Sequence, residues 1–336
     1  MSAPASASRA TDAVLALDGL TVSLDATGSQ IPVDDVSLSL RAGETLCLVG
    51  ESGCGKSMTA LACMGLLPEG GCIRSGSIRF QGREIGGASP AQWRRLRGDA
   101  LAMIFQEPMT SLNPVFTVGR QVTEPLRLHR GLDRREAWRR AGELLEQVGI
   151  PDPGQRLRAY PDELSGGQRQ RVMVAMALAC KPDVLIADEP TTALDVTIQG
   201  QILELLADLR AEHGMGLLFI THDFGVAEEI ADQIAVMYAG QIVEHGPAGR
   251  VLADPRHPYT TGLMEAIPGR ARPGERLPAL GGKVPEMGHL PDHCRFADRC
   301  PLAQPRCRRE PIPLVERQGH ASRCLFADRV GPEIWH

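Results

Sequence analysis

Short apolar runs separated by polar and glycine-rich segments are the main pattern in this chain. Residues 44–66 pass from an apolar strand through a glycine-rich turn into a helix-like stretch. Two further apolar runs, at 184–187 and 216–220, end in acidic or histidine-containing segments. Buried parallel strands read as such runs, and ligands bind at their carboxyl ends. The pattern therefore predicts an α/β domain with a mostly parallel sheet and a ligand site at that edge.

A helical block is expected between these strands, over residues 107–180. In REAWRRAGELLEQVGI, at 135–150, the apolar residues recur every three or four positions. They are Ala137, Trp138, Ala141, Leu144, Leu145 and Val148. This spacing predicts a helix with one apolar face.

Composition changes near both ends of the chain. The start, MSAPASASRATD, is small and polar, so we expect a disordered tail at 1–12. After about residue 254 proline, glycine, histidine and arginine become frequent, which favours a boundary there. We therefore expect a nucleotide-binding domain at 13–254 and a loop-rich extension at 255–336.

The overall composition excludes some classes of protein. The 336 residues are 43% apolar and carry a formal net charge of −5, which argues against a nucleic-acid-coating protein. No apolar run reaches the roughly 18 residues that a membrane helix needs, and the start lacks the apolar segment of a secretory signal. These features predict a cytoplasmic protein that does not span a bilayer.

A phosphate-binding loop is predicted between the first strand and its helix, because GESGCGKS fits the pattern G-x-x-x-x-G-K-[ST]. Glycines let backbone N–H groups turn toward phosphate oxygens, and the helix adds its positive end. Lys56 would reach the β and γ phosphates, and the Ser57 hydroxyl would ligate Mg²⁺. The predicted nucleotide contacts are Gly50, Glu51, Ser52, Gly53, Cys54, Gly55, Lys56 and Ser57.

Two acids follow the run at 184–187. Asp188 is placed to hold Mg²⁺, directly or through water, and Glu189 to orient an attacking water. Hydrolysis of ATP or GTP by in-line attack needs mainly positioning and electrostatics from the protein. Together with the phosphate loop, this pair predicts a nucleotide hydrolase.

Residues 164–195, LSGGQRQRVMVAMALACKPDVLIADEPTTALD, resemble the ATPase subunit of ATP-binding-cassette (ABC) transporters. The resemblance implies a RecA-like P-loop core and ATP sandwiched between two subunits. It makes Gln106 a Mg²⁺ ligand that links the site to membrane subunits, and His222 the switch histidine. Leu164 to Gln168 match the signature motif, whose residues Ser165, Gly166, Gly167 and Gln168 would meet the γ-phosphate of the opposite subunit. Ala193 and Asp195 match the loop that crosses the dimer interface.

One departure from this family concerns the adenine base. The family usually offers an aromatic ring after the first strand, whereas residues 20–36 contain none and Leu24 takes the place. Because base stacking on an aromatic contributes about 1 to 3 kcal/mol, we expect weak affinity for the base.

Residues 106–126 and 254–268 resemble the oligopeptide, dipeptide and nickel importer branch. The resemblance implies a peripheral subunit at the cytoplasmic face of the inner or plasma membrane. Its partners would be a second, homologous ATPase subunit, two integral membrane permease subunits and an extracytoplasmic substrate-binding protein, with no nucleic acid. Peptides are the expected cargo. The alternatives are nickel or another small solute and, from a different class, a soluble ATPase acting on ribosomes or DNA repair complexes.

Four cysteines lie among arginines in the extension: Cys294, Cys300, Cys307 and Cys324. Their spacings are more open than the paired knuckles of structural zinc sites, whereas iron-sulfur clusters accept varied spacing and a cationic surround. Relatives in the importer branch carry the same cysteines, and this implies a 4Fe-4S cluster. Zinc, or free or disulfide-bonded thiols, remain alternatives, and the extension could also sense metal or redox state. His289, His293 and His320 are expected to be loop residues.

Overall fold

The computed structural model describes residues 12–25, 27–106, 111–192, 194–267 and 280–335. Their fold comprises two compact units that alternate along the chain. The first unit takes its described residues from 1–40, 45–86 and 220–336, and the second from 41–44 and 87–219. The expected tail at 1–12 lies outside the described residues except for Asp12, and so does Ala193.

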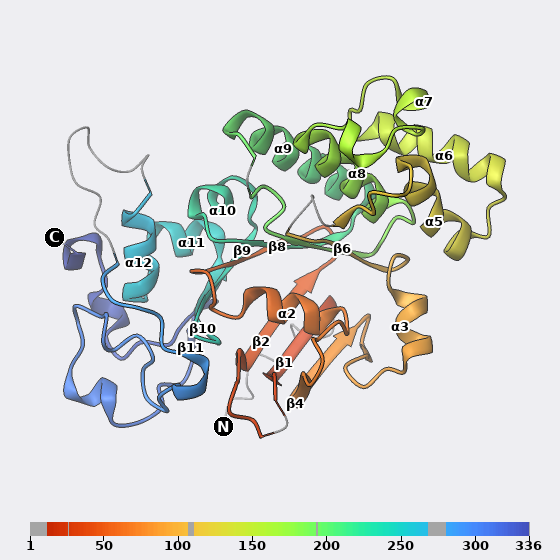
Figure 1. Ribbon diagram of the computed structural model, residues 1–336. Coiled ribbons are helices and arrows are strands. Elements are labelled where there is room, and N and C mark those ends of the chain that lie inside the picture. The colour runs from red at the N-terminus through yellow and green to blue at the C-terminus, as the bar shows by residue number, and fades with distance from the viewer. Residues whose placement is uncertain (1–11, 26, 107–110, 193, 268–279, 336) are drawn as a thin grey trace. The chain divides into compact units, whose positions relative to one another are not determined.

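A mixed sheet forms the centre of the first unit (Figure 1). Strand β3 (Thr45–Val49) pairs in parallel with β9 (Gln233–Tyr238), which pairs antiparallel with β10 (Gln241–Pro247). Two short strands, β12 (His320–Ser322) and β11 (Val315–Arg317), continue the sheet antiparallel. The β3–β9 pair is parallel, as predicted, whereas β10, β12 and β11 add antiparallel pairs that the sequence analysis did not predict, because β9 turns back directly into β10 and the extension adds two short strands.

A second sheet of the first unit has the order β2-β1-β4-β5, in which β1 pairs antiparallel with β4, and β4 pairs antiparallel with β5. The strands are β1 (Ala13–Ser23), β2 (Val33–Arg41), β4 (Cys72–Phe80) and β5 (Arg83–Glu84). In β2, buried and more exposed positions alternate over much of the strand, as expected where one face of an antiparallel strand packs on a core. The sequence analysis did not predict this sheet.

The helices of the first unit are α2 (Lys56–Cys63), α10 (Phe224–Ile230), α11 (Ala248–Ala253) and α12 (Pro258–Glu265). Among the described residues of the extension, four single 3₁₀ turns follow, at Met287–His289, Pro305–Arg308, Ala327–Arg329 and Pro332–Trp335. Strand β3, the turn after it and α2 form the strand–loop–helix unit that was predicted at 44–66.

The second unit contains β6 (Leu101–Ile104) and β7 (Val184–Asp188), which pair in parallel, and the first part of β8 (Gly216–Thr221). Its helices are α3 (Pro90–Leu96), α5 (Val118–Arg130), α6 (Arg134–Gln147), α7 (Pro153–Arg156), α8 (Gly166–Leu178) and α9 (Val196–His213), with a 3₁₀ turn at Pro161–Glu163. Asp133 caps α6, and the buried residues on this helix include Ala137, Ala141, Leu144 and Leu145. The predicted apolar helical face is confirmed.

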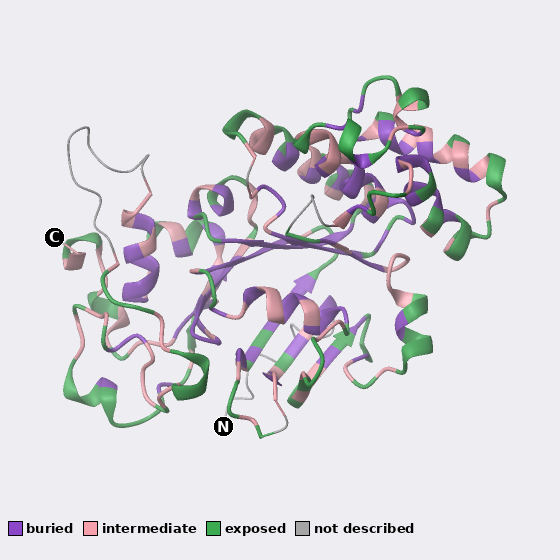
Figure 2. Ribbon diagram, in the orientation of Figure 1, coloured by how far each residue is buried: buried purple, intermediate pink, exposed green. Residues whose placement is uncertain are grey.

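Burial is concentrated in the strands of each unit (purple in Figure 2). Every residue of β3 is buried in the first unit, and every residue of β7 in the second. Such continuous apolar strands are covered on both faces. No helix among the described residues is both long enough and apolar enough to cross a membrane.

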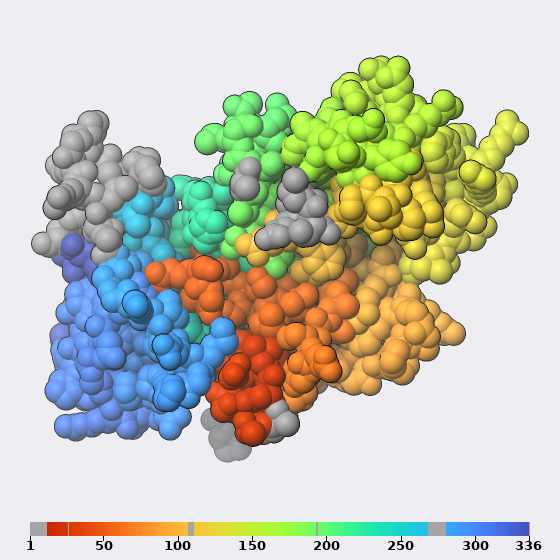
Figure 3. Space-filling view, in the orientation of Figure 1, coloured from red at the N-terminus to blue at the C-terminus, as the bar shows by residue number. Residues whose placement is uncertain are grey.

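The C-terminal segment, residues 280–335, packs on the strands of the first unit. In Figure 3 it lies in blue beside the red and orange residues of the same unit. Phe296 is 1% exposed and contacts the rings of Tyr238 and Tyr259. Trp335 donates its indole N–H to the carbonyl oxygen of Pro258, 3.2 Å away, at the start of α12. The segment 280–335 thus packs against β9, β10 and α12.

Candidate functional site

The predicted phosphate loop, Gly50–Ser57, connects the buried end of β3 to the first turn of α2. A Cβ on Gly50 would lie 2.2 Å from the carbonyl oxygen of Met237. Gly55 has φ 103° and would bring a Cβ within 2.1 Å of the Pro32 carbonyl oxygen. Glycine is therefore required at both positions by the close approach of neighbouring backbone.

Lys56 is the first residue of α2 and is 4% exposed. Its ammonium donates to the carbonyl oxygens of Gly50 at 2.8 Å and Glu51 at 3.0 Å, both within the loop. The Lys56 side chain is thus bonded to the backbone of the loop in which it would bind phosphate. Ser57 follows it in the first turn of the same helix.

Glu51, the second residue of the loop, contacts two residues of the C-terminal region. Its backbone N–H donates to the hydroxyl oxygen of Tyr259 at 2.8 Å. Its carboxylate accepts two hydrogen bonds from the Arg299 guanidinium, at 2.6 and 3.0 Å. The sequence analysis assigned no role to Tyr259, and it treated Arg299 only as part of a cationic surround.

Cys54, also in the loop, is 1% exposed, and its sulfur lies 4.0 Å from the Tyr259 hydroxyl. Burial raises the pKa of this thiol above its ordinary value. A buried thiol of this kind is a weak nucleophile, so the structure gives Cys54 a packing role.

In the second unit, Asp188 ends β7 and is 4% exposed, and Glu189 follows it. Glu189 has φ 46°, a left-handed conformation that is uncommon outside glycine and concentrates at functional sites. Its Oε2 atom accepts hydrogen bonds from the Gln106 amide at 3.1 Å and the Thr192 hydroxyl at 3.0 Å. Glu189 and Gln106, 83 positions apart in sequence, are thus brought together. The sequence analysis missed Thr192.

The signature residues Ser165–Gln168 form the beginning of α8 in the second unit. The Ser165 hydroxyl accepts the Gln168 N–H, and the Gln168 side chain accepts the Ser165 N–H. This capping box fixes the first turn. Ser165 and Gly166 are exposed, so the positive end of a 13-residue helix is open to a ligand.

His222 follows β8 and is exposed, and it lies in the part of the chain assigned to the first unit. The next residue, Asp223, caps α10 by accepting the N–H of Gly225 at 2.7 Å. His222 is therefore held at a short, well-defined turn between a strand and a helix.

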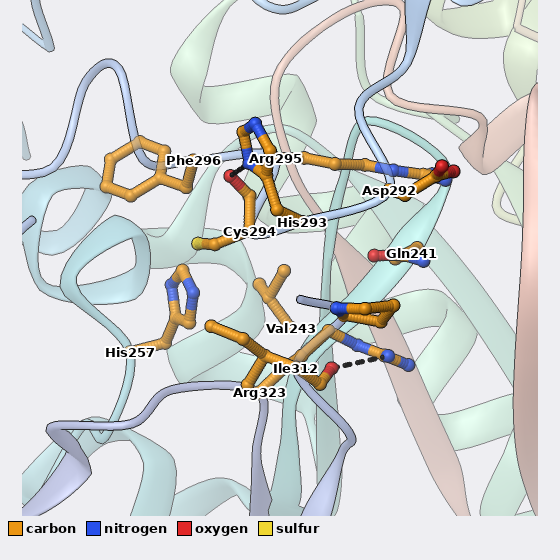
Figure 4. A pocket seen from close by; sticks show the side chains of 11 residues that line it. Gln241, Val243, His257, Asp292, His293, Cys294, Arg295, Phe296, Ile312 and Arg323 are labelled. Atoms are coloured by element: carbon orange, nitrogen blue, oxygen red, sulfur yellow. Dashed lines mark hydrogen bonds between the residues drawn. The ribbon is translucent and has the colours of Figure 1, made fainter. Parts of the chain in front are cut away.

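The four cysteines of the extension line one cavity, together with Phe296 and Ile312. Burial raises the pKa of Cys294, and it raises those of Cys300 and Cys324 to about 11 and about 12. Among the described residues, no three His, Cys, Asp or Glu side chains are close enough to hold a single metal ion. In Figure 4 the Cys294 sulfur and the His257 imidazole point into a neighbouring pocket.

The segment His257–Thr261, within the stretch 254–268 that carries the resemblance to the importer branch, lies at the start of α12 and is wholly buried. The His257 imidazole accepts the Tyr259 N–H at 3.1 Å and so caps the helix. Burial lowers the pKa of His257 to about 3, which keeps this acceptor neutral. His320 differs from expectation, because it is 1% exposed and begins β12.

Two families match the chain. The ABC transporter family matches residues 33–192. The family described as the oligopeptide/dipeptide transporter C-terminal region matches residues 243–307 and so includes Cys294, Cys300 and Cys307.

Relatives and solved structures agree with these matches. A peptide import ATP-binding protein of Brucella abortus is 50% identical over 326 residues, covering 93% of this chain and 96% of the relative. Another of the same description from Brucella melitensis is 52% identical over 308 residues, covering 88% and 91%. The dimeric ATP-binding cassette MJ0796 bound to ADP and Pi has a TM-score of 0.61 and 28% identity, covering 70% of this chain and 98% of that one.

Proposed function

The chain belongs to the ATP-binding subunits of ABC transporters, within these to the peptide import systems, and on this premise we propose which residues perform its reaction. It is an ATPase, and relatives named for peptide import favour peptides over nickel and over ribosomal or DNA-repair roles. ATP would bind at the phosphate loop, with Lys56 on the β and γ phosphates.

Mg²⁺ would be held by Ser57, Asp188 and Gln106, and it would neutralise charge on the β and γ phosphates. Water would attack the γ-phosphorus in line, so that the bond to the β-phosphate oxygen breaks and ADP leaves. Glu189 would orient that water. The observation that carries this role is the carboxylate of Glu189, held by the Gln106 and Thr192 side chains in a left-handed backbone conformation.

Turnover by Glu189→Gln tests the role of Glu189. Removal of one catalytic electrostatic group should lower turnover at least about 100-fold, while ATP still binds. Glu204→Gln, at an exposed position of α9 in the same unit, should keep wild-type turnover. Unaltered hydrolysis by Glu189→Gln would refute the assignment.

The signature and His222 would act across a dimer. MJ0796 is dimeric in a post-hydrolysis state with ADP and Pi. In this chain, the exposed start of α8 would meet the γ-phosphate bound by a second ATPase subunit, and His222 would sense that phosphate. We further propose two membrane permease subunits, an extracytoplasmic substrate-binding protein and a position at the cytoplasmic face of the membrane. Co-purification with two integral membrane proteins and a second ATPase subunit tests this assembly.

The extension would hold a 4Fe-4S cluster on Cys294, Cys300, Cys307 and Cys324. The four thiols line one cavity, yet they are not gathered closely enough for a single ion. Zinc binds sulfur at about 2.3 Å from a single ion, whereas a 4Fe-4S cluster is a group of several irons held by four cysteine thiolates. Burial raises the pKa of the Cys294, Cys300 and Cys324 thiols, and binding as thiolates would release their protons. When bound, the cluster would supply structural order and a one-electron redox centre.

Purification of the complex without oxygen, followed by iron, zinc and acid-labile sulfide analysis, tests the cluster. We expect about four irons and four sulfides per chain. Cys300→Ser should lose most of this iron, and Cys72→Ser, at an exposed cysteine outside the cavity, should keep it. Zinc near one equivalent without sulfide would overturn the cluster.

A further inference from the structure

The phosphate loop is held from outside by two side chains of the C-terminal region, and both bind Glu51. Tyr259 accepts the Glu51 backbone N–H at 2.8 Å. Arg299 forms a bidentate ion pair with the Glu51 carboxylate, at 2.6 and 3.0 Å. Such fork geometry fixes orientation as well as distance. Because backbone and side chain are both held, Glu51 has one position as long as these contacts last.

Arg299 is itself held rigidly. Its side chain is 3% exposed. Besides Glu51, its guanidinium donates to the carbonyl oxygens of Leu280 and Gly281 and to the Tyr238 hydroxyl. Each of its three nitrogens therefore has a partner. A long side chain that is buried and fully bonded has little freedom left, so it acts as a fixed support for Glu51.

Tyr259 is equally fixed. It is 0% exposed, and its ring lies against Tyr238 and Phe296, with centroids 4.6 and 5.3 Å away. The rings are tilted relative to one another, which is a geometry that aromatic pairs prefer. The hydroxyl therefore reaches the loop from a rigid aromatic cluster.

The constraint on Glu51 extends to the lysine of the loop. The Lys56 ammonium donates to the carbonyl oxygens of Gly50 and Glu51. Because these residues are neighbours in the chain, a shift of Glu51 would move both acceptors of Lys56. We propose that Tyr259 and Arg299 are positioning residues of the ATP site, which hold the loop in its phosphate-binding conformation. This inference rests on the proposed role of the loop.

Kinetics of ATP hydrolysis by the purified complex test the inference. Tyr259→Phe removes only the hydroxyl and should raise the KM for ATP about fivefold, the effect of one hydrogen bond. Arg299→Gln should raise it about tenfold or more, since two bonds to a charged group are lost, and Arg299→Lys should recover part of this loss. We expect kcat to stay within about twofold for Tyr259→Phe, since this variant changes nucleotide binding.

A matched control is Arg323→Gln. Arg323 also lies in the extension beside a cysteine, but it donates to the carbonyl oxygens of Ile242 and Ile312 and makes no hydrogen bond to the loop. It should leave the KM for ATP unchanged. If it raised the KM as much as Arg299→Gln, general loosening of the extension would explain the effect and the inference would fail.

Two further results separate this inference from the proposed ATP site. Lys56→Ala with wild-type affinity for ATP would overturn the site itself. If Lys56→Ala loses affinity while Tyr259→Phe and Arg299→Gln keep the wild-type KM, only the positioning inference is wrong. Non-additive effects of Arg299→Gln and Glu51→Gln in a double-mutant cycle would support the direct contact.

Discussion

The Nε2 atom of His320 lies 2.7 Å from Oε1 of Glu244, and both side chains are buried. Glu244 belongs to β10 and His320 to β12, so this contact joins the extension to the sheet. The same carboxylate accepts the backbone N–H groups of Arg256 at 2.6 Å and His257 at 2.9 Å, just before α12. One carboxylate therefore connects three segments of the first unit.

Glu244→Gln should destabilise this junction. An amide has one acceptor oxygen where the carboxylate has two, so at least one buried donor loses its partner. Hydrogen bonds to charged groups contribute about 1.5 to 3 kcal/mol, and we expect the melting temperature to fall by about 5 °C or more. Glu310→Gln, at an exposed position, is the control. Equal melting temperatures would mean that the junction contributes little.

Thr192→Val should slow hydrolysis without weakening ATP binding. The Thr192 hydroxyl donates to Glu189 Oε2 at 3.0 Å, and valine keeps the shape but removes the donor. Since about 1.4 kcal/mol changes a rate tenfold, we expect kcat to fall about tenfold with an unchanged KM for ATP. Thr192→Ser keeps the hydroxyl and should recover most of the rate. A change confined to KM would contradict a role in orienting Glu189.

Leu24→Tyr should strengthen binding of the nucleotide. Leu24 is half-buried after β1, where relatives of this family usually offer an aromatic ring. A stacked base contributes about 1 kcal/mol or more, so the KM for ATP should fall about fivefold. Leu24→Met tests size without aromaticity and should change little. If the tyrosine leaves the KM unchanged, the base does not lie beside residue 24.

Cys54 should resist alkylation in the folded protein. It is buried, and burial raises its pKa, so little thiolate is present near neutral pH. Iodoacetamide should modify the exposed Cys72 at least about tenfold faster, as measured by mass spectrometry of peptides. In urea both cysteines should react. Similar rates in the folded protein would contradict the packing of Tyr259 over the loop.

The sequence predicted correctly those elements of the fold that depend on neighbouring residues. The run before Gly50 is buried as β3, Lys56 begins α2, and the apolar face of α6 is placed as its spacing predicts. Each of these depends on residues within one strand or one helix. The residue roles proposed for the ATP site stay predictions until variants are measured.

Contacts between residues far apart in the sequence could not be predicted from such local patterns. Glu51 is 208 positions from Tyr259 and 248 from Arg299, and tertiary packing such as that of Phe296 and Tyr259 on Tyr238 of β9 brings them together. The strands β11 and β12 have three residues each, too short for alternation to reveal them. The arginines around the cysteines suggested a cationic surround, yet Arg295 and Arg299 are paired with Asp34 and Glu51 of the core.

Peptide uptake by the reconstituted complex tests the central claim most directly. Proteoliposomes would contain this subunit with its membrane partners, and ATP would be supplied on the side of the membrane where this subunit is bound. Uptake of labelled peptide would then be measured for wild type, Glu189→Gln and Glu204→Gln. We expect ATP-dependent uptake by wild type and Glu204→Gln, and at least about a 100-fold loss with Glu189→Gln. Equal uptake by Glu189→Gln, or uptake independent of ATP, would contradict a peptide importer driven by hydrolysis at this site.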